Sequence, residues 1–342
     1  MSVQDLIAEI NHLTESVRNH INTHRYQVVL LKDSGNWNQI CSSLDVVGDS
    51  LLAIKSYDEE KYPPDAGLKY IYTYGVLQAL FLLQDAVRHL SEAFAIVYHP
   101  SQVLIDIRNM RNAAVGHPTK QNDKGQRYYN YISRISMTKE GFDLLRHSRP
   151  GQYNVMRVEL AAASRDQLQG IAESFRLIVS KLEEADRMHV EKFQDNALVS
   201  IFHFAMGYFF EKIGQGISSP SHSYGDREFG HTHVRLVRQT YEKFKASLQE
   251  RNELNSYTEF DLDEYFHALR KLDGYLGGTE AALEEADARI YLSYLRNEHT
   301  RFVQIAKEID EDYKAKDALI NCSTDEVAEP YFSQYGVLGL PA

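Results

Sequence analysis

Two arginines and a histidine with the chemistry to act on a phosphate lie close together in the first half of the chain: Arg108, Arg111 and His117. In a helix, this spacing places both guanidinium groups within about two turns of the imidazole. Histidine exchanges a proton near neutral pH, and arginine offers a fixed positive charge. The three residues therefore predict a site for chemistry at a phosphate group, at the rim of a core.

A single helix is expected to position these side chains. Apolar residues recur at intervals of three and four between Val103 and Ala114, which predicts an amphipathic helix facing a core. Gly116 is expected to take a left-handed conformation after the last turn, and Pro118 prevents the helix from continuing. The same signals also mark an ordinary helix end, in which case His117 is only a polar loop residue.

Charge distinguishes this segment from the two other places where a histidine follows an arginine at the same spacing, Arg18 with His24 and Arg227 with His233. Residues 108–157 contain ten basic and three acidic residues, a net charge of +7, whereas the whole chain carries −11. Residues 196–342 contain 15 basic and 24 acidic residues, a net charge of −9. A polyanion is therefore expected to contact the basic segment and to be repelled by the C-terminal part.

Residues 119–160 change from a helical to a strand pattern. β-forming residues separated by turns at about 139–141 and 150–151 predict a small antiparallel meander. Tyrosines beside arginines in the first strand have the chemistry to stack unpaired bases and bind phosphates, although tyrosines more often only cover a sheet face. The residues expected to bind substrate are Arg108, Lys120, Arg127, Tyr129, Tyr131 and Arg134.

Hydrophobic periodicity over the rest of the chain predicts helices. They are expected at about 2–31, 36–55, 65–96, 164–193, 196–215, 228–253, 260–276 and 279–315. The expected fold is thus mainly α, a helical bundle with a small inserted antiparallel β-meander at about 119–160 and a second all-α region. The expected domains are residues 1–195 and residues 196–342.

Composition bounds the class of protein. A chain of 342 residues that is 43% hydrophobic buries a sizeable core. Its apolar runs are shorter than the roughly 18 residues of a membrane span, and its N-terminus lacks a signal-peptide pattern. Cys41 and Cys322 provide neither a disulfide framework nor a metal site. We therefore expect a cytoplasmic protein that makes no membrane contact.

A histidine-rich stretch at 222–233 offers metal-ligand types. His231 and His233, with Asp226, Glu228 or His222, suit a divalent cation. Because no second, well-separated ligand pair completes a known arrangement, the favoured interpretation is a solvated loop leading into a helix. No metal and no cofactor are expected.

A helical bundle with a helix that ends in Arg-Asn-x-x-x-x-His resembles the HEPN superfamily of ribonucleases, toxins and defence proteins. Arg111, Asn112 and His117 carry the resemblance, which covers roughly residues 65–195. It implies metal-independent RNA cleavage, in which a 2′-hydroxyl attacks the adjacent phosphodiester and leaves a cyclic phosphate. By this resemblance His117 is the acid/base, Arg111 the phosphate clamp and Asn112 an orienting residue, and Arg108 assists.

The resemblance also implies a homodimer, because such sites form where the motifs of two subunits meet. It suggests a toxin, stress or anti-phage defence effector that acts on short or single-stranded RNA such as tRNA. Some members carry a regulatory tyrosine two residues after the histidine, where this chain has Thr119, so that regulation is not expected. The alternative is a non-catalytic helical module that binds a nucleotide, an RNA or a protein partner through the basic segment and the acidic C-terminal half.

Overall fold

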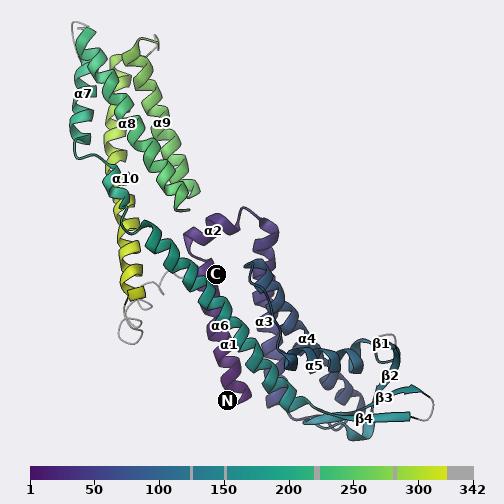
Figure 1. The fold of residues 1–342 in the computed structure, drawn as a ribbon. Helices are drawn as coiled ribbons and strands as arrows, with labels where there is room; N and C mark the ends of the chain where they lie inside the picture. Colours follow the sequence, from purple (N-terminus) through teal and green to yellow (C-terminus); the bar gives the residue numbers. More distant parts are fainter. Residues whose placement is uncertain (124–125, 150–151, 219–223, 280–282, 322–342) are drawn as a thin grey trace. The chain divides into compact units, whose positions relative to one another are not determined.

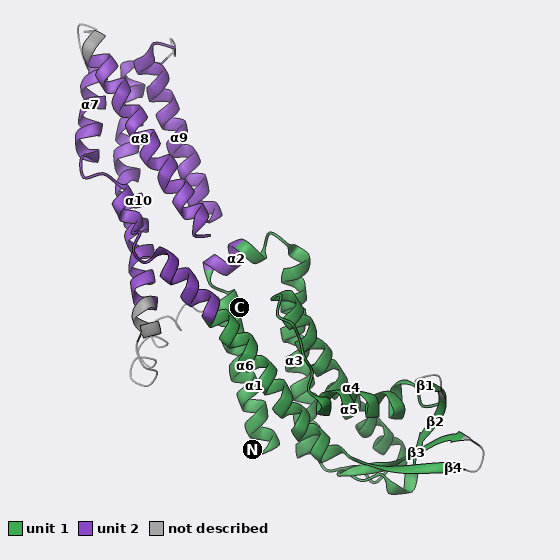
Figure 2. Cartoon of the chain, viewed as in Figure 1, with its two compact units in different colours: residues 1–23, 29–183 green, residues 24–28, 184–342 purple. Residues whose placement is uncertain are grey.

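The computed structural model of the chain describes residues 1–123, 126–149, 152–218, 224–279 and 283–321 (Figure 1). These residues form helices and one small antiparallel sheet, which confirms the predicted fold class. The chain divides into two compact units, coloured separately in Figure 2. Unit 1 comprises residues 1–23 and 29–183, and unit 2 comprises residues 24–28 and 184–342. The division falls at residue 183, whereas the sequence placed a domain boundary at residue 195.

Most helices of unit 1 begin at polar capping residues. The helices of this unit are α1 (Val3–Ile21), α3 (Ser34–Glu59), α4 (Ala66–Ala93), α5 (Gln102–Arg111) and the part of α6 (Leu160–Phe193) up to residue 183. Side chains that accept a hydrogen bond from a backbone N–H of the first turn cap four of them, namely Ser2, Asp33, Asp65 and Ser101. These caps satisfy N–H groups that the helix itself leaves unpaired, so they set where each helix begins.

The predicted single helix over residues 2–31 is wrong, because the chain leaves helical geometry after Ile21. The backbone N–H of Asn22 bonds to Arg18 O, and the hydroxyl of Thr23 donates to His20 O at 2.8 Å. Polar side chains that bond to nearby backbone compete with helix continuation. A separate helix, α2 (His24–Leu30), follows.

Two buried glutamines connect three helices of unit 1. The Gln84 side-chain amide donates to Leu104 O at 3.0 Å and to the Gln167 Oε1 at 2.8 Å. Gln167 in turn donates to Leu80 O at 2.6 Å. Both side chains are buried, so each of these bonds removes an otherwise costly unpaired group. The network fixes α5 against α4 and α6, and thereby positions the Arg111 end of α5.

The sheet of unit 1 is a four-stranded antiparallel meander in the order β1-β2-β3-β4. Its strands are β1 (Gln121–Asp123), β2 (Gln126–Ile132), β3 (Gly141–Arg149) and β4 (Gln152–Glu159). The short strand β1 adds to the meander predicted from the sequence. Buried side chains of one face pack with Leu77 of α4 and with Ala113 and Ala114, and these are Ile132, Phe142, Leu144 and Val158. We call this the inner face of the sheet.

Unit 2 is helical throughout its described residues, as predicted. Residues 184–193 of α6 are followed by a short 3₁₀ turn at Leu198–Ile201, α7 (Met206–Ser218), α8 (Tyr224–Glu250), α9 (Ser256–Gly277) and α10 (Glu285–Asn321). Its core contains the fully buried aromatic side chains of Tyr241, Phe244, Tyr265 and Phe302. Within the part of the chain that the structure describes, no helix is both long and apolar enough to cross a membrane.

The described part of the histidine-rich stretch, from Tyr224 on, is helical, which corrects its interpretation as a loop. α8 begins at Tyr224, so both described histidines lie on a helix, while His222 lies outside the described residues. His231 Nε2 lies 2.8 Å from Asp273 Oδ1. His233 is buried, and its Nδ1 contacts Phe229 O at 2.7 Å. Because the two rings meet different partners, they do not converge on one ion, and the described residues contain no metal-binding cluster.

Candidate functional site

Arg111, the last residue of α5, lies against α4 in unit 1. Its Nη2 donates to Gln78 Oε1 at 2.5 Å and its Nη1 donates to Asn112 Oδ1 at 3.1 Å. Its Cζ lies 4.1 Å from the centroid of the Phe81 ring, a cation–π distance. Three different groups therefore hold the guanidinium plane in one orientation.

Burial and a neighbouring cation affect the charge of Arg111. Desolvation lowers the pKa of its guanidinium, and the positive charge of Arg108 lowers this pKa further, while Asp85 opposes them. Arginine still carries its charge at neutral pH, because the ordinary pKa of a guanidinium lies far above neutrality. Arg108 stacks on the same Phe81 ring, with its Cζ 4.4 Å from the centroid, and donates to Asp85 at 2.9 Å. The structure thus commits Arg108 to an ion pair, whereas Arg111 bonds only to neutral groups.

The turn that follows α5 is a wide, π-type turn at Asn112–Gly116. The backbone N–H of His117 donates to Asn112 O at 2.7 Å and closes the turn. Gly116 does not take the predicted left-handed conformation. A Cβ atom at this position would lie 2.8 Å from Arg111 Nη1, closer than real Cβ contacts occur. Glycine is needed here for the close approach of the guanidinium rather than for its backbone angles.

A polar cleft of about 770 Å³ lies at the end of this turn. Residues from α5, the turn, the loop after it and the inner face of the sheet line it, among them Asp106, Asn109, Asn112, His117, Lys120 and Arg146. His117 and Lys120 are exposed. Within the described part of the chain, neither side chain has a hydrogen bond or an ion pair. His117 therefore presents a free imidazole to the cleft.

Arg146 supplies a second unpaired cation to the cleft. Its Cζ lies 3.9 Å from the centroid of the Tyr128 ring, which orients the guanidinium without a carboxylate. Its buried Nε meets no acceptor among the described residues. Arg146 follows the buried Leu144 by two positions in β3, so both lie on the inner face. An unpaired, partly buried guanidinium is suited to bind an anion.

Asn112 connects Arg111 to the cleft. Its side chain lines the cleft and also accepts the hydrogen bond from Arg111. Arg111 itself does not line the cleft. Arg111 therefore packs against α4, Asn112 lies between Arg111 and the cleft, and His117 lines the cleft.

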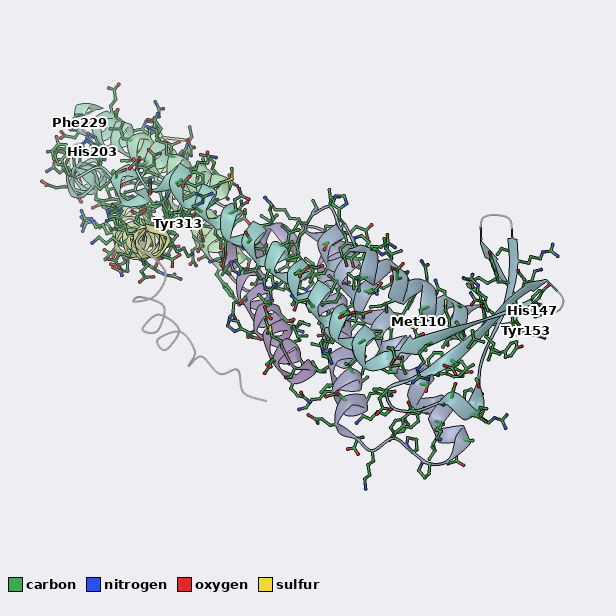
Figure 3. The ribbon with its side chains drawn as sticks, turned by 60° about the horizontal axis from the view of Figure 1, so that its bottom comes forward. Met110, His147, Tyr153, His203, Phe229 and Tyr313 are labelled. Carbon is green, nitrogen blue, oxygen red and sulfur yellow. The ribbon has the colours of Figure 1, made fainter. Side chains whose placement is uncertain are left out.

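The other predicted substrate-binding residues lie elsewhere on the sheet. Tyr129 and Tyr131 alternate with the buried Asn130, so they lie on the face opposite the inner one. Arg127, two positions before Tyr129 on β2, lies on the same face as these tyrosines. Arg134 lies in a 3₁₀ turn at Arg134–Ser136. Figure 3 labels Met110 of α5, which lines the cleft, and His147 and Tyr153 of the sheet. Only Lys120 of the predicted binding residues lines the cleft.

Arg146 and Asn109 line the cleft but were not among the site residues predicted from the sequence. Strand alternation places Arg146 on the face of Leu144, and Asn109 lies one helical turn before Ala113. Strand alternation and helical spacing identify which residues share a face of one strand or helix. They do not reveal which faces meet across a cleft.

Comparisons of the chain with protein-family models, with curated proteins and with solved structures gave no match. The resemblance to the HEPN superfamily therefore stays a prediction that depends on Arg111, Asn112 and His117.

Proposed function

We propose that this protein is a metal-independent endoribonuclease whose active site is the polar cleft beside the Asn112–Gly116 turn. One observation carries the proposal: His117, Lys120 and Arg146 line the same cleft, and none of them has an ion-pair partner among the described residues. A proton-exchanging group beside two unpaired cations suits a phosphodiester. The basic segment that contains them supports an RNA ligand in an otherwise acidic chain.

The chemistry assigns separate roles to these side chains. His117 accepts the proton of the 2′-hydroxyl, whose oxygen attacks the adjacent phosphorus. The bond from phosphorus to the 5′-oxygen then breaks, and this oxygen takes up a proton, so that a cyclic phosphate and a 5′-hydroxyl remain. Lys120 and Arg146 bind phosphate oxygens in the cleft, and Arg111 stabilises the charge of the transition state through its fixed position beside Asn112.

We further propose that two copies assemble along α4, with Arg111 of each copy close to the shared interface. Ile71 and Leu82 are 64% and 41% exposed, and with the exposed Gly75 they form an apolar stripe on α4. Gln78, which binds Arg111, lies within the stripe. Pairing of this stripe with its copy would bring the two Arg111 side chains toward one interface. A toxin or defence role belongs to the same proposal.

The test is cleavage of a tRNA and single-stranded RNA pool in EDTA by wild type and by His117→Ala. We expect products with cyclic-phosphate ends from wild type, and their loss in His117→Ala. Sedimentation of the same samples measures the oligomeric state. A folded wild-type protein that leaves all RNA intact, or activity that survives the substitution, would contradict the proposal.

A second candidate function is a non-catalytic RNA-binding module. The observation that favours it is that Arg111 is held against Gln78 and Phe81 and does not line the cleft. Retention of labelled RNA without any cleaved product in the same assay would support this alternative.

Gly116→Ala tests whether the position of Arg111 matters. The added Cβ would meet Arg111 Nη1 at 2.8 Å and Asn112 Oδ1 at 3.3 Å, so the flexible guanidinium must move away from Asn112. We expect cleavage to fall by up to roughly 10²-fold, because displacements of about 1 Å have such effects, while the melting temperature stays nearly constant. Gly48→Ala is the matched control, since Gly48 lies on α3 of the same unit and its Cβ would meet nothing within 4 Å. Equal activity of the two variants would show that Arg111 need not be fixed.

A further inference from the structure

The face of the sheet opposite the inner face carries a row of exposed aromatic rings. Tyr129 and Tyr131 of β2 and Tyr153 of β4 are 40%, 45% and 57% exposed. His147 of β3 lies between them in the register, opposite Tyr129 on one side and Tyr153 on the other. Figure 3 shows His147 and Tyr153 beside each other. We call these four residues the aromatic row.

The rings of the aromatic row order one another. The ring centroids of Tyr129 and His147 are 5.4 Å apart, those of His147 and Tyr153 are 5.2 Å apart, and those of Tyr131 and Tyr153 are 6.4 Å apart. Such cross-strand contacts are typical of aromatic pairs and hold each ring in place. A ligand that stacks on them therefore loses little affinity to the ordering of side chains.

These rings do not pack into the hydrophobic core of unit 1. The core contacts of the sheet come from Ile132, Leu144 and their neighbours on the inner face. Three tyrosines with about half of their surface exposed gather on one face of a small sheet. Exposed patches of this kind commonly mark a binding site.

We propose that the aromatic row binds the unpaired bases of single-stranded RNA, on the opposite face of the sheet from the cleft. This inference rests on the proposed function, because it assumes that RNA is the ligand, and it specifies single strands as the substrate class. Every base offers a flat surface to stack on a tyrosine, whereas the stacked bases of a duplex do not. The aromatic row then holds the strand while the cleft acts on a phosphate.

Charge favours RNA over a second copy of the chain or another protein. Arg127 lies two positions before Tyr129 on β2 and therefore on the same face. It is exposed and has no ion-pair partner among the described residues. The acidic groups beside the row are already occupied, since Arg157 binds both Asp143 and Glu159. The face therefore presents a free cation next to stacking surfaces, which is the combination that single-strand binders use.

The test measures binding separately from cleavage. Fluorescence anisotropy of a labelled 12-nucleotide oligouridylate is recorded with the full chain carrying His117→Ala, alone and combined with Tyr129→Ala and Tyr153→Ala. We expect the two alanines to raise the Kd roughly tenfold or more, whereas Tyr129→Phe and Tyr153→Phe retain the affinity. Tyr257→Ala is the matched control, because Tyr257 is 82% exposed on α9 in unit 2.

Two further readings complete the test. Arg127→Ala is expected to reduce the slope of log Kd against log salt by about 0.7, as for one lost phosphate contact on a single strand. A blunt duplex of the same length is expected to bind the tyrosine variants and their parent equally.

Each outcome separates this inference from the ribonuclease proposal. Tyrosine-dependent binding without any cleavage by wild type would support the aromatic row and refute the nuclease. Cleavage by wild type with oligouridylate affinity that the alanines leave unchanged would overturn the aromatic row alone. Loss of self-association, rather than of RNA binding, in the alanine variants would also overturn it, because the row would then bind a second copy.

Discussion

Arg111→Lys is expected to lower the rate of RNA cleavage almost as far as Arg111→Ala, by roughly 10²- to 10³-fold, which is typical for loss of a group that stabilises transition-state charge. Lysine keeps the positive charge of Arg111. It lacks the planar fork that donates to Gln78 and Asn112 at once, and it lacks the flat surface that stacks on Phe81. Single-turnover cleavage with saturating enzyme measures this effect on the chemical step.

Arg88→Ala is the matched control, because it removes an arginine from the same side of α4. Arg88 is 44% exposed and lies 3.6 Å from Asp85, three residues before it on the helix, so its loss is expected to change neither the rate nor the stability strongly. A wild-type rate in Arg111→Lys would show that only the charge matters. A wild-type rate in Arg111→Ala would place the catalytic cation elsewhere, with Arg146 as the next candidate.

Asp310→Ala is expected to destabilise unit 2 by roughly 3–5 kcal/mol, the cost of breaking a buried ion pair by removing one partner. The Asp310 carboxylate accepts hydrogen bonds from the backbone N–H groups of Leu198 at 2.7 Å and Val199 at 2.9 Å, and it lies 3.9 Å from the Arg251 guanidinium. The side chains of Asp310 and Arg251 are only 7% and 3% exposed. Alanine would leave a buried positive charge and two unpaired donors.

Urea unfolding followed by circular dichroism measures this loss, with Glu285→Ala as the matched control on the same helix. Glu285 binds Arg289 across one helical turn, and both side chains are at least half exposed, so its removal is expected to cost about 0–1 kcal/mol. Adding Arg251→Met to Asp310→Ala is expected to restore part of the stability, because the uncompensated charge is removed. Similar losses for Asp310→Ala and the control would mean that the pair contributes no more than a surface one.

Local patterns predicted most of the helices, and they failed where a local competitor or a distant partner decides the conformation. Periodicity alone extended the first helix through Asn22, where the backbone turns instead. The polar character of residues 222–233 suggested a loop, yet α8 begins at Tyr224, and in its first turns Gly230 is buried and Arg227 donates to Leu276 O of α9 at 3.1 Å. Such burial depends on neighbouring helices and is not visible in a short window.

At the candidate site, too, local sequence patterns predicted some features and contacts between distant segments decided the others. The sequence predicted that the helix continues to the residue before Gly116, whereas α5 ends at Arg111 and a π-type turn at Asn112–Gly116 follows it. Gly116 was identified as a necessary glycine for the wrong reason, because the approach of a side chain, and not a backbone angle, requires it. Arg146, which lies opposite the motif in the cleft, comes from a strand with no sequence link to the motif.

The sequence by itself determined which side chains share a face. Alternation along β2 places Tyr129 and Tyr131 together and Ile132 on the other side, and this follows from strand geometry alone. Only the tertiary structure decided that the face of Ile132 packs on the core while the tyrosines stay exposed, and that Arg146 and His117 line one cleft. Both outcomes depend on contacts between segments distant in the chain, and the free energy of burying apolar surface acts on the assembled units rather than on any single segment.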